Sequence, residues 1–398
     1  MNLLTVCVVV RDEEADLPRC LTSVSGVADE VVVVDTGSTD DTKTIARDLG
    51  ALVYDFPWTD DFAAARNYAI GRATGRWVLM LDADEELHPD DRDQVRPLLQ
   101  TDVEAYHLPI ISFLGAATPA ATATVATVPA RDFVRDLRLS LFRNRPCYRF
   151  KGAIHEELTG DFEPEGTALA PLRILHYGYL DGRMVSKQKG TRNRRLLSKE
   201  LERRPDDPFL HYCLGAELLG SADYPGALSH FQIALGHWGP TEPRHGDLLA
   251  KVALCHLYQG GYREAREVLR EGIRLYPDFT DLWFLLGGLE FQAGRTAAGR
   301  KCFERCLSLG PAPPRYSSFS GVGGDRAVLG VALTWLELAI TAAGCEPEGT
   351  DTVATGDNAS VEAAATSAAT PLLHRLQGMR QSLTDTLARP SRAFGHHQ

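Results

Sequence analysis

The segment WVLMLDADE at residues 77–85 decides the fold class of this chain. Its apolar run, Trp77–Leu81, does not alternate with polar residues, which is typical of a strand buried on both faces of a parallel sheet. Two carboxylates, Asp82 and Asp84, follow directly. Ligands of such sheets bind beyond the carboxyl ends of the strands, so this pair is placed to hold a hard cation such as Mn²⁺ or Mg²⁺. The alternative interpretation is a solvent-exposed acidic turn before a helix that starts at Glu85–Leu87.

The chain before this segment repeats one pattern, a buried strand followed by a helix. This alternation predicts an α/β domain with a mainly parallel, Rossmann-like sheet and helices on both faces. All the strands would then end at the sheet edge that carries Asp82 and Asp84. The expected strands are 3–10, 30–35 and 52–56, and the expected helices are 15–23, 41–49 and 60–73.

Polar residues stand where these strands end. Asp35 closes the second strand before the turn 36–40, and its carboxylate is a candidate acceptor for the N3–H of a uracil ring. Glu14 follows the first strand in the same way. The competing interpretation is that the turn after Asp35 only caps the next helix. For Glu14 it is that an acid in the first turn of a helix complements the helix dipole.

A further polar group lies near the start of the helix expected at 60–73. It consists of Asp61, Arg66 and Asn67, and an arginine in this place would reach a sugar or a diphosphate. A surface ion pair is the alternative.

Beyond residue 85 the chain continues the domain and then changes character. Strands are expected at 138–142 and 172–179, and a basic helix at 187–204. Residues 111–130 are rich in Ala, Thr and Pro and predict a loop insertion. The first domain is therefore expected to span residues 1–205.

Three helix pairs with a period near that of tetratricopeptide repeats follow, over residues 206–345. A helix at 327–343 would cap the stack. Residues 346–370 have the low-complexity composition of a linker, and 371–398 predict a last helix and a tail. The residues that carry the repeat pattern are Leu214, Gly215, Ala227, Phe231 and Ala234; Ala253, Ala265, Leu269, Gly272 and Pro277; and Trp283, Leu286, Gly287, Phe303 and Pro311.

Composition narrows the class of protein. The net charge of −11 argues against general nucleic-acid binding, which favours basic surfaces. The eight cysteines form no disulfide-like framework, and no apolar run is long enough for a transmembrane segment. The short apolar start lacks the features of a signal peptide, so a cytoplasmic location is expected.

Taken together, these motifs resemble the family 2 glycosyltransferases. The resemblance is strongest to the branch that includes the sublancin-type peptide S-glycosyltransferases, which often have tetratricopeptide repeats behind the catalytic domain. It covers residues 1 to about 205, and the repeats extend it to about 311. The motifs that carry it are Asp12–Glu14, Asp35–Asp40, Trp58 with Asp60–Phe62 and Ala65–Asn67, Leu81–Glu85, Ile154–Glu156 and His176–Tyr179.

The resemblance implies a GT-A fold and inverting transfer from a nucleoside-diphosphate sugar, such as a UDP-sugar, to a peptide, protein or glycan. Asp35 and Glu14 would contact the base and the ribose, and Asp82 and Asp84 would serve the donor and the cation. Asp61, Arg66 and Asn67 would also bind substrate. The repeats would offer a platform for a macromolecular acceptor.

Two further roles follow from chemistry. Inversion needs a carboxylate base on the acceptor side, and Glu156, beside His155, is the candidate. A neutral imidazole can complete a carboxylate metal site, and His176 is the candidate for this role.

Two other functions remain open. The chain would be a repeat scaffold if its first domain lacked activity. A nucleotidyltransferase would need a glycine-rich basic loop after the first strand, where this chain has the acidic segment Arg11–Glu14.

Overall fold

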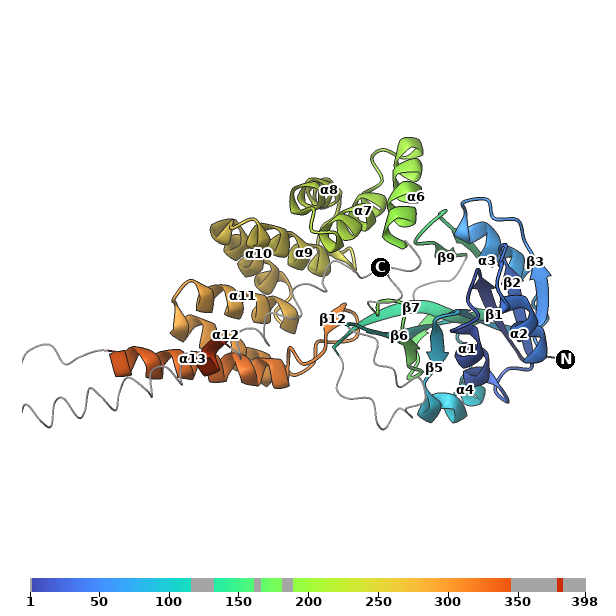
Figure 1. Cartoon of the computed structure of the whole chain (residues 1–398), viewed down its shortest axis with the longest axis horizontal. Coiled ribbons are helices and arrows are strands. Elements are labelled where there is room, and N and C mark those ends of the chain that lie inside the picture. Colours follow the sequence, from blue (N-terminus) through green and yellow to red (C-terminus); the bar gives the residue numbers. More distant parts are fainter. Residues whose placement is uncertain (1, 116–131, 161–165, 181–188, 345–377, 382–398) are drawn as a thin grey trace, which may run out of the picture. The chain divides into compact units, whose positions relative to one another are not determined.

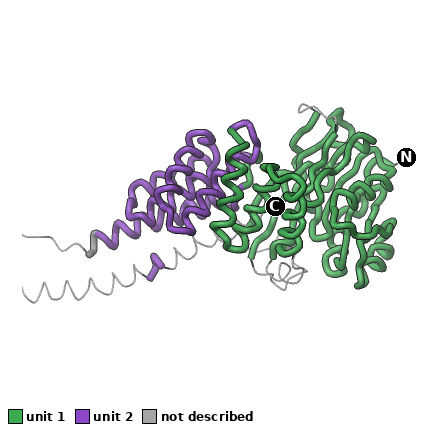
Figure 2. The backbone as a smooth tube through the Cα atoms, turned by 90° about the horizontal axis from the view of Figure 1, so that it is seen from above, with its two compact units in different colours: residues 1–239, 314–317, 395–398 green, residues 240–313, 318–394 purple. Residues whose placement is uncertain are grey.

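The computed structural model describes residues 2–115, 132–160, 166–180, 189–344 and 378–381 (Figure 1). It divides into two compact units, which Figure 2 distinguishes by colour. Unit 1 comprises residues 1–239, 314–317 and 395–398, and unit 2 comprises 240–313 and 318–394. The first helix pair of the repeats thus belongs to unit 1. The predicted boundary after residue 205 remains a proposal, and the predicted linker 346–370 lies outside the described residues, as does most of 371–398.

Unit 1 is built on a mixed sheet with the strand order β3-β2-β1-β4-β7-β6-β11-β5. The first four of these strands are parallel, and β7 joins them antiparallel to both β4 and β6. The α/β prediction with a mainly parallel, Rossmann-like portion is confirmed. The strands are β1 (Leu4–Val10), β2 (Glu30–Asp35), β3 (Leu52–Asp55), β4 (Trp77–Asp82), β5 (Glu85–Leu87), β6 (Ala105–Phe113), β7 (Phe133–Arg143), β10 (Thr167–Leu169), which pairs with β6, and β11 (Ile174–His176).

Helices cover both faces of this sheet (Figure 1). On one face Leu17 and Val95 belong to the same core as Val6 and Leu79, and on the other face Ile70 packs with Val78. β1 and β4 are buried along almost their whole length, as their unbroken apolar runs predict. The helices here are α1 (Leu17–Val24), α2 (Thr42–Asp48), α3 (Phe62–Ile70) and α4 (Arg92–Leu98), with a 3-10 turn at Pro89–Asp91 and a small hairpin of β8 (Arg149–Lys151) and β9 (Glu157–Thr159).

Two local expectations need correction. β6 continues to Phe113, so Ile111–Phe113 are strand rather than part of a loop insertion. Their side chains alternate between buried and half-buried positions because β6 pairs with β7 and β11 there. Residues 116–130 lie outside the described part of the chain. Glu85–Leu87 forms β5, which pairs antiparallel with β11, and does not begin a helix as one interpretation of the acidic turn assumed.

The helical region follows the predicted repeat pattern. α6 (Lys189–Arg203) leads from the sheet to three helix pairs and then to a long last helix. In unit 1 the pair is α7 (Pro208–Gly220) with α8 (Tyr224–His237). In unit 2 the pairs are α9 (His245–Tyr258) with α10 (Tyr262–Leu275) and α11 (Thr280–Gln292) with α12 (Thr296–Leu309), followed by the short β12 (Ser318–Phe319) and α13 (Asp325–Gly344). Among the described residues no helix is both long enough and apolar enough to cross a membrane.

The glycines of the repeat pattern have a packing role. A Cβ on Gly215 would lie 2.5 Å from Cε1 of Phe231, and one on Gly287 would lie 2.9 Å from Cε1 of Phe303. Each phenylalanine of a second helix therefore fills the space left by a glycine of the first. This contact fixes how closely the two helices of a pair approach.

Candidate active site

The candidate site lies at the carboxyl edge of the parallel strands. In the register of the sheet Val10 of β1 faces Asp35 of β2, and Val9 faces Asp82 of β4. The last residues of three neighbouring strands thus meet at one edge, as the sequence predicted. Asp35 and Asp84 are almost fully buried there, although both carry carboxylates.

Asp35 offers one hydrogen-bond acceptor to a ligand. Its Oδ1 accepts from the backbone N–H groups of Gly37 and Ser38, both at 3.0 Å, and Gly37 has a φ of 108° that favours glycine. Its Oδ2 is buried without a hydrogen-bond partner. A buried acceptor without a donor is costly, so this oxygen is suited to a ligand N–H.

Glu14 and Asp12 are both bound to the turn that follows β2. Glu14 Oε2 accepts from the N–H of Asp41 at 3.2 Å, and Asp12 Oδ1 accepts from the N–H of Thr39 at 2.7 Å. Asp12 has a φ of 52°. These contacts tie the loop after β1 to the loop after β2, and Glu14 is exposed there.

A chain of alternating charges runs through the centre of the site. Arg66 of α3 donates from Nε to Glu156 Oε1 and from Nη2 to Asp82 Oδ1, the latter at 2.8 Å. Arg138 of β7 donates from Nη1 to Asp82 Oδ2 at 3.2 Å and from Nη2 to Glu85 Oε2 at 2.6 Å. Three carboxylates and two guanidinium groups thus form one connected network.

The network sets the charge states of its members. Burial acts against the charge of Arg66, but the carboxylates of Asp82 and Glu156 outweigh it and raise the pKa of Arg66. Burial acts to raise the pKa of Asp82, yet the guanidinium groups of Arg66 and Arg138 outweigh it and lower this pKa. Both groups therefore stay charged at neutral pH.

Glu156 enters the site from the β8–β9 connection. Gly152 has a φ of 102° and His155 a φ of 49°, so the backbone reverses sharply just before Glu156. Arg66 donates to Oε1 of this residue, and the Glu156 side chain is only 9% exposed. One carboxylate oxygen of Glu156 is therefore held in place by the guanidinium group of Arg66.

Asp84 and His176 form the candidate cation site. His176 Nε2 lies 3.6 Å from Asp84 Oδ1, and its Nδ1 lies 3.0 Å from Ser112 Oγ. The contact with Ser112 orients the ring so that Nε2 faces the carboxylate of Asp84. Metal-binding histidines are commonly oriented in this way by a hydrogen bond to the other ring nitrogen. An oxygen and an imidazole nitrogen suit Mn²⁺ or Mg²⁺ as two ligands, with phosphate oxygens supplying others. The described residues contain no group of three or more His, Cys, Asp or Glu side chains that could hold a metal by itself.

The geometry does not support two predicted substrate contacts. Asn67 donates to the carbonyl of Phe150 and accepts from its N–H, both at 2.8 Å, so its amide fastens α3 to β8. Asp61 is the N-cap of α3 and accepts from the N–H of Ala64 at 2.8 Å. Both residues act on the position of Arg66 through the helix that carries it.

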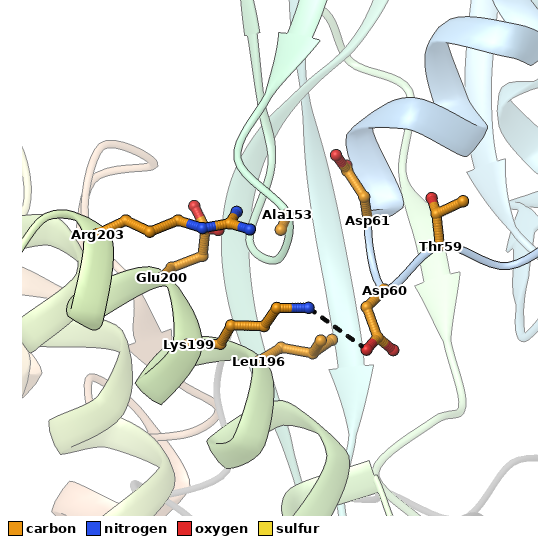
Figure 3. A pocket seen from close by; sticks show the side chains of 8 residues that line it. All are labelled: Thr59, Asp60, Asp61, Ala153, Leu196, Lys199, Glu200 and Arg203. Carbon is orange, nitrogen blue, oxygen red and sulfur yellow. Dashed lines mark hydrogen bonds and ion pairs between the residues drawn. The ribbon is translucent and has the colours of Figure 1, made fainter.

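A cavity of about 190 Å³ lies beside this site within unit 1 (Figure 3). One wall is α6, with Leu196, Lys199, Glu200 and Arg203, and the other is the turn Thr59–Asp61, with Ala153 between them. The φ of Asp60 is 61°, and both of its oxygens accept from Arg195 at 2.7 Å. These hydrogen bonds lower the pKa of Asp60 and fasten α6 to the entry of α3.

Sequence reasoning missed Arg138, Ser112 and the role of Glu85. Arg138 lies within a strand of mixed pattern, and nothing in its neighbours distinguishes it from the arginines at 135 and 143. The place of Arg138 in the site can be recognised only from the pairing of β7 with β4 and β6, because this pairing brings Arg138 to the end of β4.

Sequence comparison agrees with this geometry. The family model "Glycosyl transferase family 2" matches residues 5–148, and a tetratricopeptide repeat model matches residues 251–314. The first part of this chain is a family 2 glycosyltransferase domain, and tetratricopeptide repeats follow it. The family 2 match ends before Glu156, His176 and α6, so the remaining site residues lie outside it.

Individual proteins are similar to parts of this chain. A TPR repeat-containing protein of Synechococcus elongatus is 38% identical over 65% of this chain and 63% of its own length. The SPbeta prophage-derived glycosyltransferase SunS of Bacillus subtilis is 25% identical over 64% of this chain and 58% of its own length. The chain thus spans less than two thirds of either relative. A solved structure of glucosyl-3-phosphoglycerate synthase from Mycobacterium tuberculosis, with Mn²⁺ and UDP, is 27% identical over 28% of this chain and 44% of that chain, with a TM-score of 0.24.

Proposed function

We propose that this protein transfers a sugar, with inversion, from a nucleoside-diphosphate sugar to a peptide, protein or glycan acceptor. The observation that carries the proposal is the ion-pair network from Asp82 through Arg66 to Glu156. It joins the end of β4, helix α3 and the β8–β9 connection in one site. An inactive scaffold would have no need to keep these buried charges, whose desolvation is costly.

The donor would lie along the carboxyl edge of the sheet. Asp35 Oδ2 would accept the N3–H of uracil, which favours a UDP-sugar, and Glu14 would lie near the ribose. A divalent cation held by Asp84 and His176 would neutralise charge on the leaving diphosphate. Arg66 would face the sugar or the diphosphate from α3 while holding Glu156.

The transfer step follows from inversion. Glu156 Oε2 would take the proton of an acceptor O–H or S–H group, and the freed electron pair would form the bond to the anomeric carbon. The bond from that carbon to the diphosphate oxygen breaks on the opposite face, and the diphosphate leaves with its electron pair. His155 would help to shape the acceptor side, since its backbone conformation directs the turn that ends in Glu156.

The repeats would hold the acceptor, since stacked helix pairs form an extended surface suited to peptides. The described cysteines are all free, which supports a reducing, cytoplasmic location.

The test is a screen of UDP-, GDP- and dTDP-sugars with Mn²⁺, measuring release of the nucleotide. Release from at least one donor that is abolished by Asp84→Asn supports the proposal. If no donor is bound or cleaved, the scaffold hypothesis is preferred. Release of inorganic pyrophosphate would instead indicate a nucleotidyltransferase.

A further inference from the structure

Arg192 is a half-buried cation on α6, the helix that leads from the sheet to the repeats. Its guanidinium group lies over the ring of Phe62, with Cζ 5.0 Å from the ring centroid. Phe62 begins α3 and precedes Arg66 by one helical turn, so the two side chains share a face of that helix. The contact therefore places Arg192 at the end of α3 that lies beside the candidate site.

The charge of Arg192 lacks the carboxylate partners that the other arginines of the site have. Arg66 and Arg138 each donate to two carboxylates. Arg192 instead donates from Nε and Nη2 to the amide oxygen of Asn193, at 3.4 and 3.2 Å, and in the part of the chain that the structure describes it forms no ion pair. A partly buried charge without a counter-charge is costly, so this guanidinium group is suited to an anionic ligand.

Acidic groups of the site act on Arg192 at longer range. Burial lowers the pKa of Arg192, and the charges of Glu217, Glu13 and Asp84 act against this effect without offsetting it. Glu13 follows β1 and Asp84 follows β4, so both belong to the carboxyl edge of the sheet. Arg192 thus lies in the electrostatic field of the edge along which the donor is proposed to bind.

Asn193 connects Arg192 to the first helix of the repeats. Its amide oxygen accepts from Arg192, and its amide nitrogen donates to Glu217 Oε1 at 2.8 Å. Glu217 lies on α7, and burial raises the pKa of its carboxyl group. Because a side-chain amide has one donor side and one acceptor side, the hydrogen bond with Glu217 determines which side faces Arg192. A hydrogen-bonded chain therefore runs from α7 to the guanidinium group.

We propose that Arg192 binds the diphosphate of the donor and that Glu217, acting through Asn193, is a positioning residue for it. This inference rests on the proposed function, in which the donor is a nucleoside-diphosphate sugar. A guanidinium group can donate two parallel hydrogen bonds to phosphate oxygens, so its orientation decides how well it binds them. The first helix pair of the repeats then contributes to donor binding, although the family 2 match ends at residue 148.

The test measures the affinity of the full-length chain for UDP and for uridine by ligand-observed NMR titration in the presence of Mg²⁺. Arg192→Met should weaken UDP binding at least about tenfold, because a charge-assisted contact to the phosphates is lost. Uridine has no phosphate and should bind as it does to the wild type, which also shows that the variant is folded. Arg263→Met is the matched control, since it removes the same charge from an exposed pair with Glu267.

Variants of Glu217 separate positioning from folding. Glu217→Gln keeps an oxygen for Asn193 and should bind UDP like the wild type. Glu217→Met removes that oxygen and should weaken UDP binding about threefold, while uridine binding stays unchanged. The loss caused by Glu217→Met should disappear when Arg192→Met is also present, since both substitutions act on one contact.

Three results would overturn the inference. UDP affinity at the wild-type level in Arg192→Met, or an equal loss of UDP and uridine affinity, would do so and leave the proposed function standing. A loss from Glu217→Met that persists in the Arg192→Met background would show that Glu217 does not act through this arginine. If the wild type binds neither UDP nor uridine, the inference fails together with the UDP-sugar donor of the proposed function.

Discussion

At the scale of single residues, the site depends on how a few buried charges are shared. Arg66 is the central group, because it holds Asp82 and Glu156 together from the second turn of α3. Asn67 and Asp61 keep that helix in place through backbone contacts. Asn67 and Asp61 therefore help to set the position of Arg66 and, through it, of Glu156.

Asp84→Asn tests the cation site. The substitution removes the charge that would bind the cation, so transfer or donor hydrolysis should fall by at least about 100-fold. The assay is nucleotide release with and without Mn²⁺, and EDTA should give a similar loss in the wild type. Activity that persists in EDTA or in the variant would contradict the assignment of Asp84 and His176 to a metal.

Glu156→Gln tests the base. Donor binding should remain close to that of the wild type, while kcat falls by at least about 100-fold, the lower end of the range for general base catalysis. Glu157→Gln is the matched control, because Glu157 begins β9 and is exposed, and its kcat should be near that of the wild type. A variant at Glu156 that loses donor affinity but keeps kcat would show that this residue binds the donor instead.

The position of a site residue was predictable only where the local sequence pattern determines it. Asp35, Asp82 and Asp84 stand at strand ends, and this position follows from the apolar runs before them. The role of Asn67 was not predictable, because its partner Phe150 is far away in the sequence and belongs to a hairpin without a strong pattern. Arg138 was missed for the same reason.

At the scale of elements, α11 carries a buried carboxylate that makes its packing sensitive to pH. Asp281 is 1% exposed, and it accepts from Ser318 Oγ at 2.6 Å and from the N–H of Phe319 at 2.9 Å. Burial raises the pKa of Asp281 to about 7 despite these hydrogen bonds. The ordinary value of this pKa is 3.8.

This pKa predicts the direction of a stability change. Between pH 4 and pH 7 the folded chain binds a proton that the unfolded chain has released, so the free energy of unfolding should fall as the pH rises and then level off above about pH 7. Asp281→Asn should remove this component. The measurement is urea unfolding of both proteins from pH 5 to pH 8. Parallel pH profiles would contradict the assignment.

The helix pairs allow a sharper test of packing. Gly287→Ala places a methyl group 2.9 Å from Phe303, and overpacking of this kind costs about 1–3 kcal/mol. Gly288→Ala on the same helix meets nothing within 4 Å and should be neutral or slightly stabilising, since alanine favours a helix over glycine. Thermal unfolding distinguishes the two variants. Equal transition temperatures would mean that the glycine does not set the helix spacing.

The parallel strands β1 to β4 and the helices were largely predictable, and β6 was not. The helical repeats follow from glycine and aromatic spacing along a local sequence. The sequence predicted no strand at Ala105–Phe113 and placed its last residues in a loop, because their pairing with β7 and β11 cannot be read from local composition.

At the scale of the whole molecule, the chain joins a family 2 glycosyltransferase domain to tetratricopeptide repeats. A chain ending at Gly239 keeps residues 1–239 of unit 1 and lacks the two helix pairs of unit 2. It should bind UDP and hydrolyse the donor like the full chain, but transfer to a macromolecular acceptor should fall by at least about tenfold, because the extended surface is lost. The two rates are compared in parallel. Full transfer by the short chain would show that unit 2 serves another purpose.

The hydrogen bonds between Asp60 and Arg195 have a consequence for how such proteins can recombine. The family 2 match ends at residue 148, yet α6 is fastened to the turn before α3 by a carboxylate in an unfavourable backbone conformation. A chimaera that exchanges the chain at residue 148 would break this fastening and expose buried Leu196 and Leu197. Chimaeras that fold should therefore keep α6 together with the sheet. The segment that must be exchanged as a whole is longer than the family 2 match, which ends at residue 148.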